Sequence, residues 1–130
     1  MKPATILIAD DNAGMLTAIG VRLEQCGYNV LRATDAYHAF NHAVRERPDL
    51  LILDIHMPAG EGFSVIERIN GIQGAKRVPF LFLTGDSDPG LARRADQLGA
   101  FALLRKPFAT RELLGIIERA LKPLPAAFAA

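Results

Sequence analysis

The 130-residue chain predicts an α/β fold in which five short strands alternate with five helices, a doubly wound (βα)5 arrangement around a parallel sheet. Three observations support this fold class. Short apolar runs recur along the chain, segments with helical spacing separate them, and half of the residues are hydrophobic. A chain of this size can bury about two-thirds of the surface that its unfolded form exposes, which favours one domain with one core.

Four of the predicted strands are expected to be buried on both faces, because their apolar residues follow one another without alternation. They are TILIA at 5–9, LLILD at 50–54, PFLFLT at 79–84 and FALL at 101–104. A fifth run, YNVLRA at 28–33, alternates more and indicates an edge strand. Parallel pairing requires crossovers at least a helix long, and the segments between the runs provide them.

Apolar stripes at helical spacing lie between these runs. The first stripe ends before Gly27, an expected C′ residue, and the second begins after Asp35 as N-cap and ends before Pro48. The fourth stops at Gly99. The single cysteine, Cys26, lies on the first stripe and is predicted to be buried and inert. The five stripes are Leu16, Ile19, Leu23 and Cys26; Ala36, Ala39, Phe40 and Ala43; Val65, Ile66 and Ile69; Leu91, Ala95 and Leu98; and Leu113, Leu114, Ile117 and Leu121.

Net charge and hydropathy exclude some classes of binding partner and indicate where the protein is located. Fifteen basic and 14 acidic residues give a formal net charge of +1, so neither nucleic acid nor an anionic membrane is an expected partner. No window approaches the roughly 20 apolar residues of a membrane helix, and the amino-terminal run is too short for a secretory signal. The sequence therefore predicts a cytoplasmic protein with one domain at 4–121. The tail at 122–130 is expected to be a frayed end or the start of a linker.

Polar residues follow four of the predicted strands at their carboxyl ends. Asp10 and Asp11 follow the first strand, Asp54 ends the third, Thr84 ends the fourth and Lys106 follows the fifth. Open parallel sheets bind ligands beyond this edge, where the strand order reverses. With the order 2-1-3-4-5, which is taken from fold analogy, the three carboxylates are expected to converge.

Three converging carboxylates require a compensating positive charge, since two unit charges about 4 Å apart cost roughly 4 kcal/mol at an effective dielectric near 20. Mg²⁺, or Mn²⁺, suits oxygen ligands and accepts phosphate oxygens beside them. Lys106 adds a permanent charge, and a positioned carboxylate can attack phosphorus to give an aspartyl phosphate. Each residue alone also has a structural explanation, such as a helix cap, a turn or a solvated lysine. Their joint placement at one edge favours a phosphoryl site.

Four motifs carry a resemblance to a known family: IADDN at 8–12, LDIHMPAGEGF at 53–63, LFLTG at 81–85 and GAFALLRKPF at 99–108. With them the chain resembles the receiver domain of two-component response regulators, including the chemotaxis regulators, which have a flavodoxin-like fold. The resemblance extends from residue 4 to about residue 121.

The resemblance implies that Asp54 accepts a phosphoryl group from the phosphohistidine of a sensor histidine kinase or a histidine phosphotransfer protein. It implies that Asp10, Asp11, Asp54 and the backbone carbonyl of His56 hold Mg²⁺. It also implies that Thr84 is the switch hydroxyl and that Lys106 pairs with the phosphate.

The resemblance further implies a signalling module and not an enzyme, since its catalysis is limited to its own phosphorylation and dephosphorylation. A downstream protein would read the fourth helix, fifth strand and fifth helix, without direct contact to nucleic acid. The chain is expected to be a monomer or a weak phosphorylation-dependent dimer.

Several residues depart from the family pattern or stand beside it. Leu103 occupies the position, three before the lysine, where many receivers have a switching aromatic residue, and Phe101 is not expected to replace it. Glu61 stands where an aspartate is usual. The His56 side chain is expected to face solvent beside the site, and Asp86 is a candidate for positioning the hydrolytic water.

Other features of the sequence have weaker functional interpretations. His38 and His42 lie one turn apart and could bind zinc, but a solvated face is the preferred interpretation. Arg93 and Arg94 are either an interaction surface or solubilising charges. The bond between Lys106 and Pro107 is expected to be cis, because this isomer would aim the ammonium into the crevice.

Three alternatives to a phosphorylated receiver are open. An aspartate-nucleophile phosphohydrolase would carry a second acid two residues after the first, whereas Asp10 is followed by Asp11, Asn12 and Ala13. A pseudo-receiver would bind proteins without being phosphorylated, although the presence of all five site residues disfavours it. A flavin-binding protein would need a hydroxyl- and glycine-rich phosphate loop, and DDNAGM at 10–15 offers carboxylates that repel phosphate.

Overall fold

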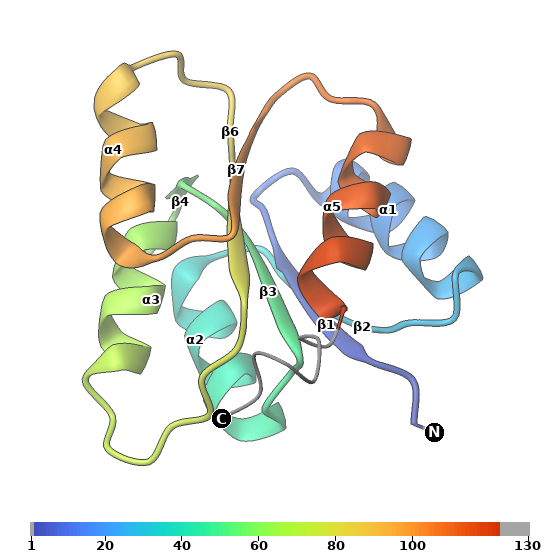
Figure 1. Ribbon diagram of the computed structural model, residues 1–130, viewed down its shortest axis with the longest axis horizontal. Helices are drawn as coiled ribbons and strands as arrows, with labels where there is room; N and C mark the ends of the chain where they lie inside the picture. The colour runs from blue at the N-terminus through green and yellow to red at the C-terminus, as the bar shows by residue number, and fades with distance from the viewer. Residues whose placement is uncertain (1, 123–130) are drawn as a thin grey trace, which may run out of the picture.

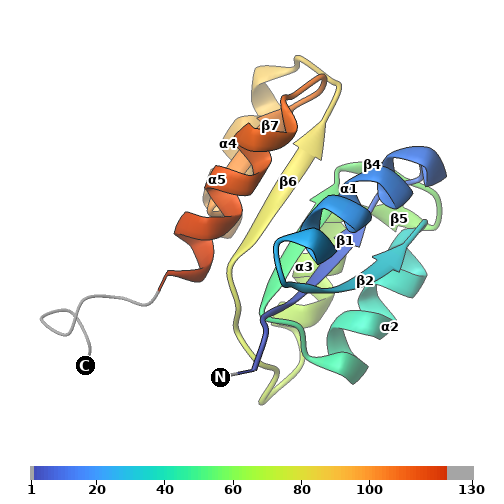
Figure 2. The same cartoon turned by 90° about the vertical axis from the view of Figure 1, so that its right-hand side faces the viewer.

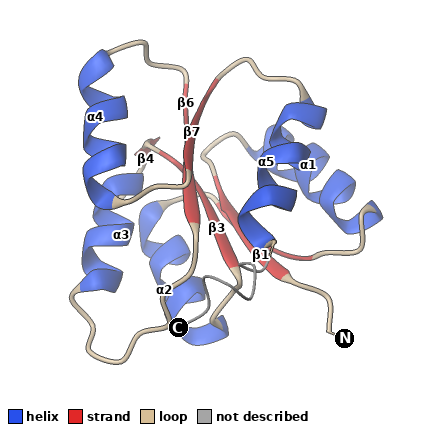
Figure 3. Ribbon diagram, in the orientation of Figure 1, coloured by secondary structure: helices blue, strands red, loops and turns tan. Residues whose placement is uncertain are grey.

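The structure is a computed structural model that describes residues 2–122, in which a parallel sheet is covered by helices on both faces (Figure 1, Figure 3). The elements in chain order are β1 (Thr5–Ala9), α1 (Ala13–Gln25), β2 (Asn29–Ala33), α2 (Ala36–Glu46), β3 (Leu50–Asp54), β4 (His56–Met57), β5 (Gly60–Glu61), α3 (Gly62–Asn70), β6 (Phe80–Thr84), α4 (Pro89–Leu98), β7 (Ala102–Arg105) and α5 (Thr110–Leu121).

The main sheet has the order β2-β1-β3-β6-β7, and every neighbouring pair in it is parallel. Counted over these five strands, this is the predicted order 2-1-3-4-5, so the fold class is confirmed. The order reverses between β1 and β3, which places the ends of these two strands side by side. Figure 2 shows α1 and α5 on one side of the sheet, opposite α2.

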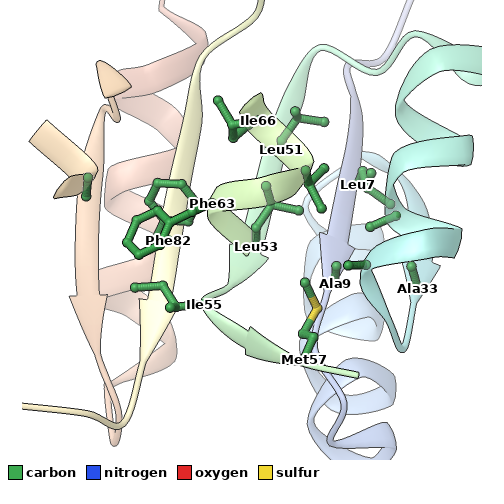
Figure 4. Close-up of a cluster of buried hydrophobic side chains, with 14 residues drawn as sticks. Leu7, Ala9, Ala33, Leu51, Leu53, Ile55, Met57, Phe63, Ile66 and Phe82 are labelled. Atoms are coloured by element: carbon green, nitrogen blue, oxygen red, sulfur yellow. The ribbon is translucent and has the colours of Figure 1, made fainter. Parts of the chain in front are cut away.

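The sheet divides the hydrophobic interior into two layers, where the sequence predicted one core. Side chains alternate between the faces along each strand. On β6, Phe82 packs into the layer with α2, α3 and α4, whereas Leu81 packs into the layer with α1 and α5. Figure 4 shows the first layer, in which the rings of Phe63 and Phe82 meet edge to face at 4.8 Å between centroids.

Three predicted helix ends are confirmed. Asp35 caps α2 and accepts a hydrogen bond from the His38 amide at 2.7 Å. Gly27 follows the C-cap of α1 with a positive φ of 95°, and Gly99 ends α4 with a φ of 86°. Both glycines thus adopt the left-handed conformation that other residues disfavour.

The prediction that Cys26 is buried is wrong, because the thiol-bearing residue is exposed. Cys26 is the C-cap of α1, and the last residue of the apolar stripe that packs inward is Leu23. The stripe therefore ends one turn before the sequence pattern does.

Three of the five strands of the main sheet begin later than predicted. β2, β6 and β7 begin one residue after the predicted runs, and β7 also continues to Arg105. Phe101 lies outside β7 and is 46% exposed. The two-residue strands β4 and β5, which form a small antiparallel hairpin, were not predicted.

Among residues 2–122, none of the helices combines the length and the apolar character that a bilayer-crossing segment requires. The predicted tail at 122–130 lies almost entirely outside the described residues, which include only Lys122 of it.

Candidate functional site

Three aspartates meet at the carboxyl edge of the sheet, where its strand order reverses. Asp10 follows β1 and is fully buried, Asp54 is the last residue of β3 and is 4% exposed, and Asp11 is exposed. One carboxylate oxygen from each of the three lies within 4.8 Å of the others. They converge because β1 and β3 are neighbours, with Ala9 paired with Leu53.

Lys106 reaches the two buried carboxylates from the loop after β7. Its Nζ donates to Asp10 Oδ2 at 2.6 Å and to Asp54 Oδ2 at 3.1 Å. The bond between Lys106 and Pro107 is cis, as predicted, and the Lys106 amide donates to the Thr84 carbonyl at 2.7 Å. The end of β6 therefore anchors the backbone of Lys106, whose side chain bridges Asp10 and Asp54.

The other oxygen of each buried carboxylate is held by a backbone amide. The amide of Asn12 donates to Asp10 Oδ1 at 2.9 Å, and that of His56 donates to Asp54 Oδ1 at 3.2 Å. In both acids Oδ2 thus faces Lys106 while Oδ1 is fixed by the chain two residues further on. This arrangement orients the carboxylates before any ligand binds.

The charges of the site shift two pKa values. Burial, followed by the negative charge of Asp10, raises the pKa of Asp54, and the hydrogen bond and charge of Lys106 offset only part of this rise. Burial by itself lowers the pKa of Lys106, but its hydrogen bonds to Asp10 and Asp54 outweigh that effect and raise the pKa. Even with Lys106 beside it, the buried Asp54 carboxylate is thus less favoured in its charged form than a free aspartate.

The donor set fits a hard divalent cation. Three carboxylates offer only oxygen ligands, and their mutual repulsion is relieved by a positive charge placed among them. Among residues 2–122, these three aspartates are the group of acids, histidines and cysteines close enough together to share an ion. Asp10, Asp11 and Asp54 could thus hold Mg²⁺ or Mn²⁺. The role of the His56 carbonyl as a further ligand stays a prediction.

Thr84 lies at the same edge, at the end of β6, and is fully buried. Its Oγ1 accepts a hydrogen bond from the amide of Asp86 at 3.0 Å. Since Asp54 pairs with Leu83 in the sheet, Thr84 is one residue beyond the acceptor candidate along the neighbouring strand. The hydroxyl is close to the site but is engaged with the loop that follows it.

His56 and Asp86 flank the site on its solvent side. His56 Nε2 lies 3.3 Å from Asp86 Oδ2, and both residues are exposed. A hydrogen bond from the Asp88 amide, followed by the one with His56, lowers the pKa of Asp86. The imidazole is thus directed to Asp86 and is absent from the acidic cluster described above.

Sequence reasoning missed two residues next to the site. Arg105 donates through Nη1 to the Asp86 carbonyl at 2.7 Å. Gly62 begins α3 so close to β3 that a Cβ on it would lie 2.5 Å from the Asp54 carbonyl oxygen. The motif GEG, which ends at Gly62, was a possible signal of close backbone packing. Nothing in the sequence indicated which atoms Arg105 would contact.

Several other candidates have structural contacts. His38 Nδ1 lies 2.7 Å from Asp35 Oδ2, within the cap of α2, which agrees with a structural interpretation. Arg94 links α4 to α3, because its guanidinium lies 3.1 Å from Glu67 and 4.4 Å from the centre of the Phe63 ring. Leu103 is half-buried against the layer formed with α2, α3 and α4.

A hollow of about 160 Å³ lies at the opposite end of the sheet, near the first residues of β3 and β6. Its walls are largely apolar, and its charged lining residues are Arg47, Lys76 and Arg77. No acid is present among the described residues that line it, so it does not resemble the acidic edge. The chemistry inferred from the sequence belongs to that edge.

The amino-acid sequence matches known proteins over most of its length. Residues 6–118 match the family described as the response regulator receiver domain. The chain is 34% identical over 121 residues to the DNA-binding transcriptional regulator NtrC of Rhizobium meliloti, covering 93% of this chain and 25% of that protein. It is 31% identical over 122 residues to the phosphate regulon transcriptional regulatory protein PhoB of Pseudomonas aeruginosa, covering 94% and 53%. The chain thus spans a quarter to about half the length of these relatives.

Solved structures resemble the whole described fold. The non-phosphorylated HemR receiver domain of Leptospira biflexa matches with a TM-score of 0.85 and 35% identity, over 95% of this chain and 98% of that one. The chemotaxis response regulator CheY4 of Vibrio cholerae matches with a TM-score of 0.83 and 30% identity, over 92% and 99%. With the sequence match over residues 6–118, these likenesses show that the chain belongs to the receiver domain family of two-component response regulators.

Proposed function

We propose that this chain accepts a phosphoryl group on Asp54 in a reaction that depends on Mg²⁺ or Mn²⁺, and that the modification switches a protein-binding surface. The observation that supports this best is the position of Lys106 Nζ, within 3.1 Å of both buried carboxylates, in a site where three aspartates are close enough to share an ion. A phosphoryl group on Asp54 would lie beside one fixed cation and a second, exchangeable one.

Asp10, Asp11 and Asp54 would hold the divalent cation, together with the His56 carbonyl. When bound, the ion supplies positive charge to the phosphoryl oxygens and offsets the repulsion among the carboxylates. The protein supplies the remaining groups, and they are already oriented: Asp54 Oδ1 is fixed by the His56 amide and Oδ2 faces Lys106. Such preorganisation lowers the cost of reaching the transition state.

In the proposed transfer, an oxygen of Asp54 forms a bond to phosphorus as the bond from phosphorus to the histidine nitrogen of the donor breaks. The electron pair of that bond remains with the imidazole, which takes up a proton from water. Lys106 stays protonated throughout, in agreement with its raised pKa, and pairs with a phosphoryl oxygen. Hydrolysis of the acyl phosphate by water returns the free carboxylate and inorganic phosphate.

Thr84 would complete the switch by turning its hydroxyl from the Asp86 amide to a phosphoryl oxygen. The ensuing shift of β6 and its following loop would change the face formed by α4, β7 and α5, which a downstream protein reads. A sensor histidine kinase or histidine phosphotransfer protein is the proposed donor, in the cytoplasm. The DNA-binding activity named for NtrC is a property of a longer protein, and direct DNA binding is not proposed for this receiver.

The experiment that tests the acceptor is phosphotransfer from a panel of histidine kinases, and from acetyl phosphate with Mg²⁺, to the wild type and to Asp54→Asn. We expect the wild type to gain the mass of one phosphoryl group and the variant to gain none. Asp96→Asn is the matched control, since it neutralises an exposed acid on α4, outside the cluster. Label that persists in Asp54→Asn would refute the assignment, and no label in the wild type would favour a pseudo-receiver.

A separate experiment tests the metal site. Mg²⁺ at ten times its dissociation constant should raise the free energy of unfolding by about 1.4 kcal/mol, because it binds the folded state alone. Asp11→Asn should weaken this effect, and Asp96→Asn, which neutralises an exposed acid on α4, should leave it unchanged. An equal response to Mg²⁺ in all three proteins would exclude Asp11 as a ligand.

A separate assay addresses the phosphohydrolase alternative. Turnover of an external phosphate ester by the wild type would support that alternative.

A further inference from the structure

In the loop between β6 and α4, residues 85–88, Asp86 takes part in several hydrogen bonds through its amide, its carbonyl and both carboxylate oxygens. Its amide donates to Thr84 Oγ1 at 3.0 Å, and its Oδ1 accepts from the Asp88 amide at 2.9 Å. Its Oδ2 lies 3.3 Å from His56 Nε2, and its carbonyl accepts from Arg105 Nη1 at 2.7 Å. Asp86 thus joins the end of β6 to two other parts of the chain.

Arg105 reaches this loop because of its place on the neighbouring strand. It is paired with Thr84 in the register of β6 and β7. Leu104 is buried in the layer with α1 and α5, so alternation directs Arg105 to the face that carries α4. The exposed guanidinium extends past Thr84 and donates to the carbonyl two residues further on. The charged donor makes this hydrogen bond shorter and stronger than a neutral one.

The contact matters for Thr84 because the same residue, Asp86, holds the threonine hydroxyl. A threonine that accepts a bond from the amide two residues later is oriented toward its own loop. Fixing the Asp86 carbonyl limits how far that amide can move. The Thr84 hydroxyl can exchange the Asp86 amide for a new partner at low cost only when the loop at residues 85–88 can move with it.

We infer that Arg105 is a positioning residue that holds Asp86 and thereby keeps the Thr84 hydroxyl turned away from the phosphorylation site, so that it opposes the switch. This inference rests on the proposed function of Asp54 and deepens it. The contact adds a hydrogen bond between β7 and the loop that follows β6. On the same strand, Leu103 occupies the position at which many receivers have a switching aromatic residue.

The first test compares the binding of beryllofluoride, with Mg²⁺, to the wild type and to Arg105→Ala by isothermal titration calorimetry. We expect the variant to bind about threefold to tenfold more tightly, the range that the loss of one opposing hydrogen bond allows. Loss of a positive charge would by itself weaken the binding of an anion, so tighter binding cannot arise from net charge. Unchanged or weaker binding by Arg105→Ala would overturn the inference.

Two further variants make this comparison specific. Arg105→Lys retains a donor that can reach the carbonyl and should bind with an affinity between those of the wild type and Arg105→Ala. Arg111→Ala removes an exposed arginine at the start of α5 and should bind as the wild type does. Equal tightening in Arg111→Ala would show that the effect does not depend on the contact between Arg105 and Asp86, and would contradict the role of Arg105.

A second readout decides the matter without any phosphoryl mimic. Amide hydrogen exchange of Asp86, measured by NMR in the protein without ligand, should be several-fold faster in Arg105→Ala and unchanged in Arg111→Ala. Unchanged exchange in Arg105→Ala would overturn the inference. If the wild type fails to bind beryllofluoride, the proposed function of Asp54 falls, and the exchange rates still show whether Arg105 holds Asp86.

Discussion

At the scale of single residues, Asp54 is a carboxylate that the free protein holds at an energetic cost. It is almost fully buried beside Asp10. The pKa of Asp54 is raised by this burial and by the charge of Asp10, and Lys106 offsets only part of the rise. The repulsion between Asp10 and Asp54 would favour a divalent cation at this site.

We predict that Asp54→Asn stabilises the metal-free protein at neutral pH by roughly 1 kcal/mol, because it removes a buried like charge. The pKa of Asp54 is above its ordinary value of 3.8 in the folded state, so the folded protein holds a proton that the unfolded chain has lost. The contribution of Asp54 to wild-type stability should therefore fall as the pH rises from 3.8 through its folded pKa, and the advantage of the variant should shrink at lower pH.

Urea unfolding with a chelator present, at neutral and at mildly acidic pH, measures this difference. Asp96→Asn, which changes an exposed acid on α4, is the control and should match the wild type at both pH values. A variant less stable than the wild type at neutral pH would show that the hydrogen bond with Lys106 outweighs the repulsion.

The sequence predicted which residues converge, and it did not predict what they contact. Asp10, Asp54 and Lys106 could be placed because each follows a recognisable strand and parallel strands end at one edge. The Thr84 hydroxyl bond and the reach of Arg105 could not, since they depend on the path of a loop. Cys26 was misplaced because helical spacing does not show where a helix stops packing.

At the scale of elements, the approach of α3 to β3 determines how closely the acceptor strand is covered. The Gly62 amide donates to the Ile55 carbonyl at 2.9 Å, and α3 begins at this residue. A larger residue would press on the backbone of Asp54. The glycine is therefore required by close packing, since its own φ is not among the positive ones.

We predict that Gly62→Ala lowers the free energy of unfolding by about 1–3 kcal/mol, the usual cost of overpacking. An added Cβ would lie 2.5 Å from the Asp54 carbonyl oxygen, and backbone atoms cannot easily move aside. Gly71→Ala is the matched control at the end of the same helix, where a Cβ would lie 3.4 Å from the nearest atom. Denaturant unfolding should leave that control within about 0.5 kcal/mol of the wild type. Equal stability of the two variants would contradict this account.

Long periodic elements were predictable, and short ones were not. The helices and the main strands follow apolar patterns that burial imposes on the sequence. The hairpin of β4 and β5 has two residues in each strand, too few to show a period. The start of β7 was misplaced by one residue because Phe101 is apolar yet exposed, and the pattern does not distinguish such a residue from a buried one.

At the scale of the whole molecule, the two apolar layers share the backbone of one sheet, so they should unfold together. We predict that Leu81→Ala and Phe82→Ala, neighbours on β6 that face opposite layers, each cost about 2–5 kcal/mol and preserve a single unfolding transition. Circular dichroism and tyrosine fluorescence, to which Tyr28 in the layer of Leu81 contributes, should give the same midpoint.

Phe101→Ala is the control for this experiment, because it removes a similar side chain that is 46% exposed. It should cost much less than Phe82→Ala. Two separate transitions in either core variant would mean that the layers fold independently.

The sheet order was confirmed, but it came from fold analogy and not from the residues. Apolar runs show that strands exist and that both faces are covered, whereas the pairing of β1 with β3 depends on contacts distant in sequence. For the same reason the sequence predicted that both faces are covered but did not assign each buried residue to one of the two layers.

The order β2-β1-β3-β6-β7 leaves β2 and β7 at the margins of the sheet. Each is short, and each carries an arginine near its carboxyl end, Arg32 and Arg105. A strand of a second copy that approached either margin would have to desolvate a guanidinium before extending the ladder. An arginine at each margin thus disfavours pairing of that edge with a strand of a second copy.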